Sequence, residues 1–293
     1  MAIIDLGTPP VAPRGLLESL PRRISLTLPE LRVLAECAGG APLPFDVTGE
    51  ADATLGHRLG PTPAGAEDEA YAAAVGSLHE PHSSLARRGL LVDTVADESL
   101  MGAIGLLATP SLAIDLDVAV AGDRVKAWHR QRNGAVATLA TADGLVFELA
   151  WFPIEKWADE MARVAVLPED HPTDESGVPR DVDLSYELVD AAAEAVRSNR
   201  ADLLSVLAAD RLDLVPLLSA LVSEPAGRLR ALVADVSTSA TTTVGVVSWV
   251  LLADGWRALR PRRADGADLL EVRYVQPRDL ATELAPVLAE VTR

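Results

Sequence analysis

Histidine is the residue type best suited to acid–base catalysis and metal binding at neutral pH, and the chain has five histidines. His79 and His82 lie in the sequence HEPH, whose spacing loosely resembles that of two metal ligands. Pro81 interrupts the helix that would point both imidazole rings at one ion, and no other His or Cys follows nearby. We therefore expect no metal site in this segment.

His129 and Cys37 are the other two candidates for chemistry. His129 follows Trp128 within a predicted strand, a pattern more typical of a half-exposed sheet histidine than of a catalytic base. Cys37 lies inside a predicted amphipathic helix, where a small core residue is expected rather than a nucleophile. Because it is the single cysteine, it also excludes an intramolecular disulfide.

Sequence motifs that carry known chemistry are missing from the chain. It has no GxSxG elbow, no GxxxxGK[ST] phosphate loop and no GxGxxG following a strand. Its carboxylates are numerous, but no pair has the apolar surroundings that would shift a pKa for acid–base work. We therefore expect no catalytic residue, no cofactor and no enzyme activity, and we interpret the tryptophans as core or interface anchors.

One order of elements occurs twice in the chain, around residues 106–164 and again around residues 220–291. Each copy has a helix that ends near a proline, four strands, a second proline and an amphipathic helix; the prolines are Pro110 and Pro153, then Pro225 and Pro277. Trp128 and Trp249 occupy matching points in the second strand of each copy. Such self-similarity predicts a duplicated antiparallel β-meander with a pseudo-two-fold relation.

The strands are predicted from a period of two and from turn chemistry. Apolar residues alternate with small or acidic ones from Leu112 to Val120, which gives the strand one core face. The stretch from Val244 to Leu252 is apolar on both faces and should be central in its sheet. Four dipeptides supply the positive φ of tight hairpins: Asn133-Gly134, Asp143-Gly144, Asp254-Gly255 and Asp265-Gly266.

The helix that closes each copy begins at a proline, which suits a first turn because no N–H is needed there. Trp157 and Leu284 lie on the apolar stripes of these two helices, so we expect both to be buried. Pro286 should interrupt and kink the second one.

The remaining chain divides into helices, loops and one linker. We interpret residues 1–23 as an arm, 25–38 as a strand and a helix with Leu31, Val33, Leu34 and Cys37 facing the core, and 48–65 as a loop; further helices are predicted at 66–77, 83–89, 97–108, 184–198, 201–209 and 212–222. The predicted halves are 1–167 and 184–293, joined by an acidic, proline-rich linker at 168–183 within one compact domain. The class is α+β.

Composition limits the compartment and the partners. The chain has 293 residues, of which 49% are hydrophobic, and a net charge of −17. No apolar run approaches the roughly 18 residues of a membrane span, and the first residues do not resemble a signal peptide, so we expect a cytoplasmic protein without membrane insertion. The acidic excess argues against nucleic acid, and the basic run from Arg257 to Arg263 is interpreted as a solvated hairpin edge.

Several segments resemble EspG-type proteins, the cytoplasmic chaperones of ESX (type VII) secretion systems in actinobacteria. The segments are LTLPELRVLAECAG, SLARRGLLVD, LATPSLAIDLDVAV, GRLRALVADV and VVSWVLLADGWRALRPR, followed by the closing helix. Taken in order, these segments span nearly the whole chain. The resemblance implies a mixed antiparallel sheet flanked by helical bundles, with a pseudo-two-fold relating the halves.

The same resemblance implies a binding function. EspG-type proteins hold PE–PPE heterodimers by the tip of the PPE partner and cover an apolar end. The expected partner is thus a helical secretion substrate, PE–PPE-like or a small WXG-like hairpin, and a homodimer remains open. The resemblance places client contacts on the hairpin formed by Arg130, Gln131, Arg132, Asn133 and Gly134, which the sequence independently marks as a polar, cationic tip. Two alternatives stay open: an enzyme or small-ligand binder with a cavity between meander and closing helix, and a structural dimerisation module.

Overall fold

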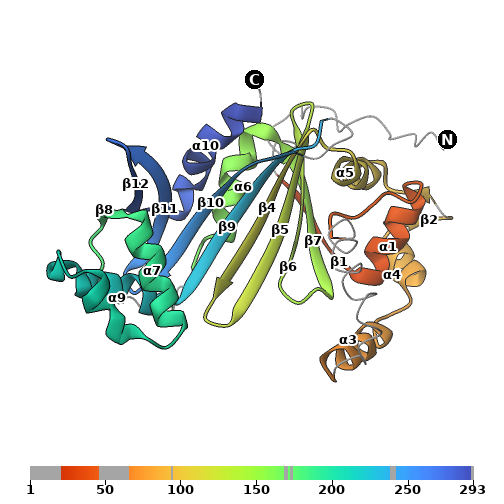
Figure 1. The fold of residues 1–293 in the computed structure, drawn as a ribbon. Helices are drawn as coiled ribbons and strands as arrows, with labels where there is room; N and C mark the ends of the chain where they lie inside the picture. The colour runs from red at the N-terminus through yellow and green to blue at the C-terminus, as the bar shows by residue number, and fades with distance from the viewer. Residues whose placement is uncertain are drawn as a thin grey trace, which may run out of the picture. The chain divides into compact units, whose positions relative to one another are not determined.

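The computed structural model describes residues 21–45, 66–93, 95–167, 171, 174–237 and 242–291. Its strands form one ten-stranded sheet in the order β1-β7-β6-β5-β4-β9-β10-β11-β12-β8, and β2 and β3 form a separate ladder (Figure 1). The pairs β1–β7, β7–β6, β6–β5, β10–β11, β11–β12 and β12–β8 of this sheet are antiparallel. The α+β class with a large antiparallel sheet is therefore confirmed, whereas the duplication and the pseudo-two-fold stay predictions.

The chain divides into two compact units, which are described separately below. One unit comprises Met1–Asp115, Val125–Trp157 and Ala234–Thr242, and the other comprises Leu116–Arg124, Ala158–Val233 and Thr243–Arg293. The division into halves at 1–167 and 184–293 stays a prediction.

The first unit contains the meander predicted for the first copy. Its strands are β4 (Leu112–Val120), β5 (Asp123–Arg132), β6 (Ala135–Thr141) and β7 (Val146–Pro153), with β4 continuing into the second unit. Trp128 of β5 pairs with Leu139 of β6, and Leu139 pairs with Leu149 of β7, so these three side chains share one face.

The strand β1 (Arg22–Thr27) adds to β7, with Leu26 opposite Phe147. The arm predicted for residues 1–23 is therefore wrong at Arg22 and Arg23, which belong to this edge strand. Pairing with β7, more than a hundred residues away in sequence, stabilises the strand, and no local sequence pattern predicts that pairing.

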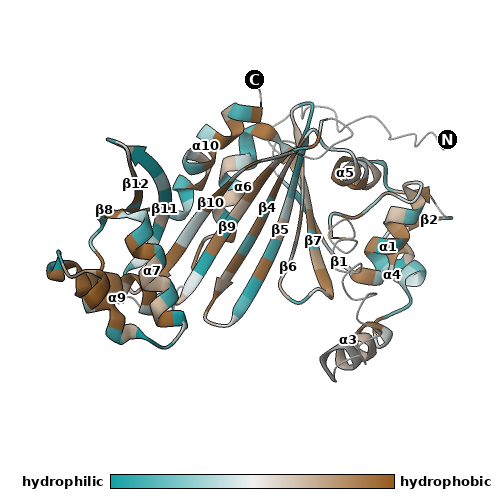
Figure 2. Cartoon of the chain, in the orientation of Figure 1, coloured by the Kyte–Doolittle hydropathy of each residue, from teal (hydrophilic) through white to brown (hydrophobic). Residues whose placement is uncertain are grey.

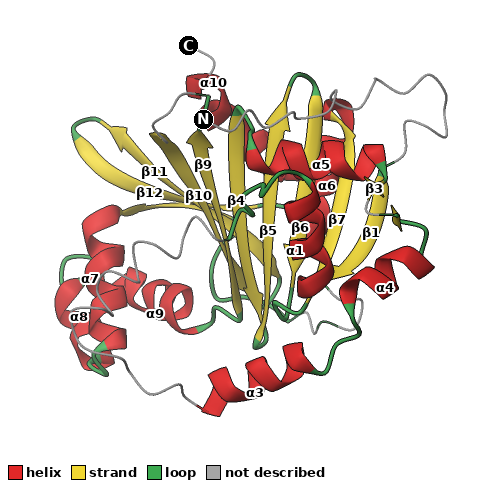
Figure 3. Ribbon diagram, turned by 90° about the vertical axis from the view of Figure 1, so that its right-hand side faces the viewer, coloured by secondary structure: helices red, strands yellow, loops and turns green. Residues whose placement is uncertain are grey.

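Helices cover the face of β5–β7 that carries Trp128, Leu139 and Leu149. They are α1 (Leu28–Cys37), α4 (Pro81–Arg87) and α5 (Glu98–Ala108), with β2 (Leu91–Val92) and β3 (Val95–Ala96) between α4 and α5. Figure 3 shows α1 and α5 lying over these strands, and their leucines join the strand residues in one buried cluster. The helix α3 (Ala66–Gly76) contributes no described residue to this buried cluster and contacts the β6–β7 turn through Tyr71, whose hydroxyl donates to the Gly144 carbonyl. The helices predicted at 66–77, 83–89 and 97–108 are present with small changes at their ends.

The helix α1 begins where its residues can satisfy its first N–H groups. Thr27 accepts a hydrogen bond from the Glu30 N–H, and the Glu30 carboxylate accepts one from the Thr27 N–H. Leu31 and Leu34 are fully buried as predicted, but Cys37 is exposed. The core position predicted for Cys37 is wrong because it is the last helical residue, after which the chain turns away through Gly39 and Gly40 at positive φ.

The second unit contains the second meander and an additional edge strand. Its strands are β9 (Gly227–Asp235), β10 (Thr242–Leu252), β11 (Gly255–Ala264), β12 (Ala267–Tyr274) and β8 (Asp181–Ser185). β10 lies inside the strand order, as its apolar sequence predicts. The predicted linker extends too far, because Asp181–Asp183 pair with β12 as part of β8.

A layer of helices buries one side of the β8–β12 part of the second unit. The helices are α7 (Tyr186–Arg197), α8 (Leu204–Leu207) and α9 (Val215–Ser223), with short 3-10 turns at Ala201–Leu203 and Leu212–Leu214. Leu218 and Leu221 of α9 join Leu252, Leu270 and Val272 of the strands in one cluster.

The two closing helices are present where they are predicted. α6 (Trp157–Val164) follows a 3-10 turn at Ile154–Lys156, and α10 (Leu280–Val291) follows one at Pro277–Asp279. Trp157 is 6% exposed and Leu284 is fully buried, which confirms both predictions. α10 runs through Pro286 without a break, so the predicted interruption is wrong.

Candidate functional site

The predicted site is the hairpin between β5 and β6. Arg132 pairs with Ala135, so Asn133 and Gly134 alone form the turn, with φ of 51° and 78°. Asparagine tolerates the left-handed conformation and glycine, without a Cβ, adopts it freely, as the sequence predicts. The Gly134 carbonyl accepts a hydrogen bond from the Ile154 N–H at 2.9 Å, which fixes the turn against the end of β7.

Arg130 does not belong to the exposed tip. It shares a face with Trp128 because the two are separated by two positions in β5. It is 7% exposed, and its Nη1 donates to Asp115 Oδ1 at 2.6 Å and to the His129 carbonyl at 3.1 Å. The prediction of a solvated cation at this position is therefore wrong.

Arg132, Asn133 and Gly134 are exposed, and Gln131 is partly exposed. Arg132 Nη1 donates to the Thr109 carbonyl at 3.2 Å, and the Gln131 carbonyl accepts from the Ser111 N–H at 2.8 Å. The tip is thus held in place by the segment that follows α5, and one exposed guanidinium remains at its surface. This geometry can bind a partner but contains no group placed for catalysis.

His129 points to the opposite side of β5 from Arg130 and is 2% exposed. The half-exposed position predicted for it is wrong, because the Trp157 side chain packs against the imidazole ring. The Trp157 Nε1–H donates to His129 Nδ1 at 3.1 Å, and the neutral ring then carries its proton on Nε2, which has no hydrogen-bond partner in the described part of the chain. Burial, and secondarily the positive charge of Arg130, lowers the pKa of His129 to about 3.

This buried histidine should make the protein sensitive to acid. In the unfolded chain its pKa is about 6.5, so the unfolded state binds the proton first, and stability is lost as the pH falls from about 6.5 towards about 3. Between pH 7.5 and pH 5 the loss from this group should be about 2 kcal/mol. His129→Asn, which keeps an acceptor for Trp157, should flatten the pH profile of urea unfolding. Exposed His79→Asn is the control, and an equally steep profile in His129→Asn would contradict the assignment.

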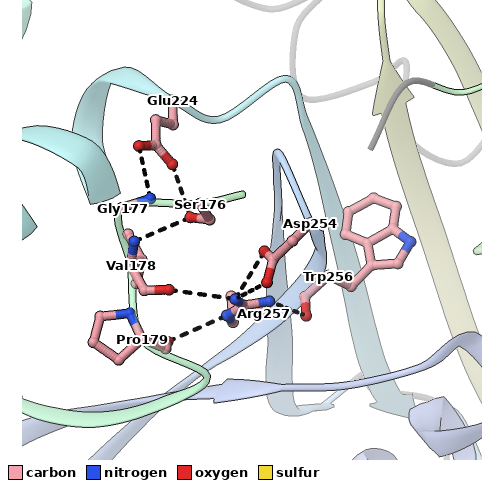
Figure 4. Close-up of polar contacts among 8 residues, drawn as sticks. All are labelled: Ser176, Gly177, Val178, Pro179, Glu224, Asp254, Trp256 and Arg257. Carbon is pink, nitrogen blue, oxygen red and sulfur yellow. Dashed lines mark hydrogen bonds and ion pairs between the residues drawn. The ribbon is translucent and has the colours of Figure 1, made fainter. Parts of the chain in front are cut away.

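Arg257 organises a second polar cluster, which sequence reasoning placed on a solvated hairpin edge (Figure 4). Its side chain is fully buried and donates to both oxygens of Asp254 at 2.8 Å and to the carbonyls of Val178 and Pro179 at 3.4 Å. The guanidinium also lies 5.1 Å from the centre of the Tyr274 ring. The interpretation as a solvated edge is wrong for Arg257, because these groups replace water around its charge.

Glu224 fixes Ser176 and Gly177, which directly precede Val178 and Pro179 in the chain. Its carboxylate accepts from the Ser176 hydroxyl at 2.8 Å and from the Gly177 N–H at 3.1 Å (Figure 4). A Cβ at Gly177 would lie 2.9 Å from Glu224 Oε1 and 3.0 Å from the Ala220 Cβ, so the glycine permits the close approach. Residues 176–180 are therefore anchored rather than a free linker.

Comparison with known proteins places the fold. No family model and no curated protein sequence matches the chain. A similar solved structure is that of the Mycobacterium tuberculosis type VII secretion system chaperone EspG5 in complex with a PE25–PPE41 dimer. The two chains superpose with a TM-score of 0.65 over 91% of this chain and 96% of the other, at 13% identity. The chain has an EspG-like fold.

The EspG-like fold confirms the resemblance found in the sequence, and other features bear on the alternatives. The described residues bring no three His, Cys, Asp or Glu side chains together in a way that could hold a metal ion. Glu80 of the HEPH segment instead caps α4 by accepting from the N–H groups of His82 and Ser83. None of the helices in the described ranges has the length and apolar character of a membrane span.

The β11–β12 hairpin is hydrophilic (Figure 2). A surface hollow of about 320 Å³ lies beside it. It is lined by Tyr186, Pro261, Arg262, Arg263, Asp268 and Leu269. Arg262 pairs with Asp183, and Arg263 lies 3.7 Å from Asp268, so both arginines that line the hollow already face carboxylates. The hollow is bounded by the β11–β12 hairpin and the start of α7. Its place differs from that of the predicted cavity, which was expected between the meander and the closing helix.

Proposed function

We propose that this protein is a cytoplasmic chaperone-like protein that keeps a helical type VII secretion substrate soluble by covering its apolar tip. The observation that carries the proposal is the EspG-like fold over 91% of the chain, since the similar EspG5 structure contains a PE25–PPE41 dimer. The substrate class is accordingly PE–PPE-like or WXG-like, and the proposed action is binding without catalysis.

Exposed apolar side chains support a binding role. Val92 and Val95 pair directly in the β2–β3 ladder and are 63% and 72% exposed, and Val206 and Leu212 near α8 are 67% and 62% exposed. Apolar side chains at the surface are the groups from which a partner would remove water.

Co-purification from the native host, followed by mass spectrometry, tests the proposal. A tagged copy should recover a small helical secretion substrate in near-stoichiometric amount, and that complex should re-form from the two purified components. Recovery of the chain without any such substrate, under conditions in which the secretion genes are expressed, would contradict the proposed function.

We also propose the β5–β6 hairpin as one client contact, now restricted to its exposed residues, Gln131 to Gly134. Arg132→Glu should leave the melting temperature nearly unchanged, because exposed charge changes usually alter stability by no more than about 0.5 kcal/mol. It should weaken client binding at least tenfold, about 1.4 kcal/mol, by calorimetry with the co-purified client. Arg200→Glu, on an exposed arginine that pairs with Asp202, is the control for net charge.

Arg130 must be left out of that test. Arg130→Glu would place a second carboxylate beside Asp115 in a largely buried position, and removing one partner of a buried pair is strongly destabilising. We therefore expect Arg130→Glu/Arg132→Glu to lower the melting temperature, unlike Arg132→Glu alone, because Arg130 is buried. An Arg132→Glu protein that binds the client as tightly as the parent would exclude the hairpin.

A further inference from the structure

One strand of the second unit carries an open, cationic face. In β9, Leu229, Ala231 and Val233 are fully buried, while the alternate residues Arg228, Arg230 and Leu232 are exposed. Because side chains alternate along a strand, the three exposed residues lie on one face. Leu232 is 37% exposed and adds an apolar side chain to this face.

The neighbouring strand β10 extends this face. A Cβ at Gly245 would lie 2.8 Å from Val287 of α10, and one at Gly227 of β9 would lie 3.3 Å from the Cβ of Leu251. The odd-numbered positions of both strands therefore share the side covered by α10. Val246 points to the other side, is 46% exposed, and joins Leu232 as an apolar part of the open face.

The two arginines on this face, Arg228 and Arg230, have no ion-pair partner among the residues that the structure describes. Neither Arg228 nor Arg230 makes an ion pair or donates a hydrogen bond within the described part of the chain. On the adjacent strand β4, Asp117 is engaged by Arg124, whose Nε donates to Oδ1 at 2.7 Å. Two neighbouring cations that no carboxylate of the described ranges pairs with, in a protein of net charge −17, indicate a surface that attracts an external anionic group.

We infer that this face of β9 and β10 binds an acidic helical segment of the client, an inference that rests on the proposed function for the client's class. Residues at i and i+2 of a strand lie about 7 Å apart, and carboxylate-bearing residues at i and i+4 of a helix lie about 5–6 Å apart, so two glutamates can reach Arg228 and Arg230 together. An apolar residue one turn further along the same helix would then lie over Leu232 and Val246.

The inference is testable with peptides of defined sequence, before any client is known. The probes are two alanine-rich helical peptides of about 20 residues with leucine on the binding face, one carrying glutamate at i and i+4 and the other glutamine. Fluorescence anisotropy should show the glutamate peptide binding at least tenfold more tightly than the glutamine peptide. Its affinity should fall as salt is raised, because the contact is ionic.

The variant Arg228→Glu/Arg230→Glu should weaken binding of the glutamate peptide at least tenfold. Arg197→Glu/Arg263→Glu changes the charge equally at exposed arginines elsewhere in the second unit and should bind as the parent does. Thermal unfolding checks that each variant is folded. If Arg228→Glu/Arg230→Glu does not fold, Arg228→Gln/Arg230→Gln is measured in its place. Equal affinity for the two peptides, or no binding of the glutamate peptide at about 1 mM, overturns the inference.

The outcomes separate this inference from the proposed function. If a secretion substrate co-purifies but binds the Arg228/Arg230 variants as tightly as the parent, the inference fails and the proposed function stands. If the peptide results hold and no secretion substrate co-purifies, the acidic-helix site stands and the proposed function fails.

Discussion

Replacing Arg257 by leucine should lower the free energy of unfolding by about 3–5 kcal/mol, the usual cost of removing one partner from a buried ion pair. The guanidinium is fully buried and satisfies both oxygens of Asp254 and the carbonyls of Val178 and Pro179. Leucine fills part of the volume but donates nothing, so these acceptors lose their donor. Asp254 keeps 25% of its side chain exposed, which places the expected loss towards the lower end of that range.

Urea unfolding measures this effect, and two further variants interpret it. Arg262→Leu removes an arginine from the same strand whose side chain is 41% exposed, and it should cost no more than about 1 kcal/mol. Arg257→Lys keeps the charge but loses the planar fork, so its loss should be intermediate. If Arg257→Leu unfolds within about 1 kcal/mol of the parent, the cluster does not anchor residues 176–180.

The strands and turns of the two meanders were predictable because their determinants are local. The alternation from Leu112 to Val120 and the dipeptides Asn133-Gly134 and Asp265-Gly266 act within a few residues, and both dipeptides take positive φ. The edge strand β8 and the first residues of β1, Arg22 and Arg23, were missed, since both edge strands depend on a distant partner, β12 and β7 respectively. A short strand of this kind has little β-propensity of its own, and the sequence does not show which strand it pairs with.

The predicted site was only partly recoverable for a related reason. Trp128 and Arg130 share a face of β5, so the period of two already indicated that Arg130 lies on the apolar side. What the sequence does not show is that Asp115 lies 2.6 Å away and makes burial of the charge tolerable. Arg228 and Arg230 of β9 illustrate the converse, because only the structure shows that no carboxylate of the described residues pairs with them.

The fold also predicts a large effect at the closing helix of the second unit. Leu284 is fully buried on α10, between Leu280, also fully buried, and Val287, which packs on Gly245. Leu284→Ala removes three buried carbons and leaves a cavity whose walls relax only in part, so it should cost about 2–5 kcal/mol in urea unfolding. The helix is additionally tied to β11 by the ion pair of Glu283 with Arg260, which holds the backbone in place and limits collapse around the cavity.

Leu288→Ala is the matched control for that experiment, because it makes the same chemical change one turn further along α10 at a partly exposed position. It should cost clearly less than Leu284→Ala, since part of its surface stays in water in the folded state. Leu284→Met conserves the volume and should cost less than about 1.5 kcal/mol. Equal losses for Leu284→Ala and Leu288→Ala would mean that helix propensity or fraying governs both. The conclusion that α10 closes the core of its unit through Leu284 would then have to be abandoned.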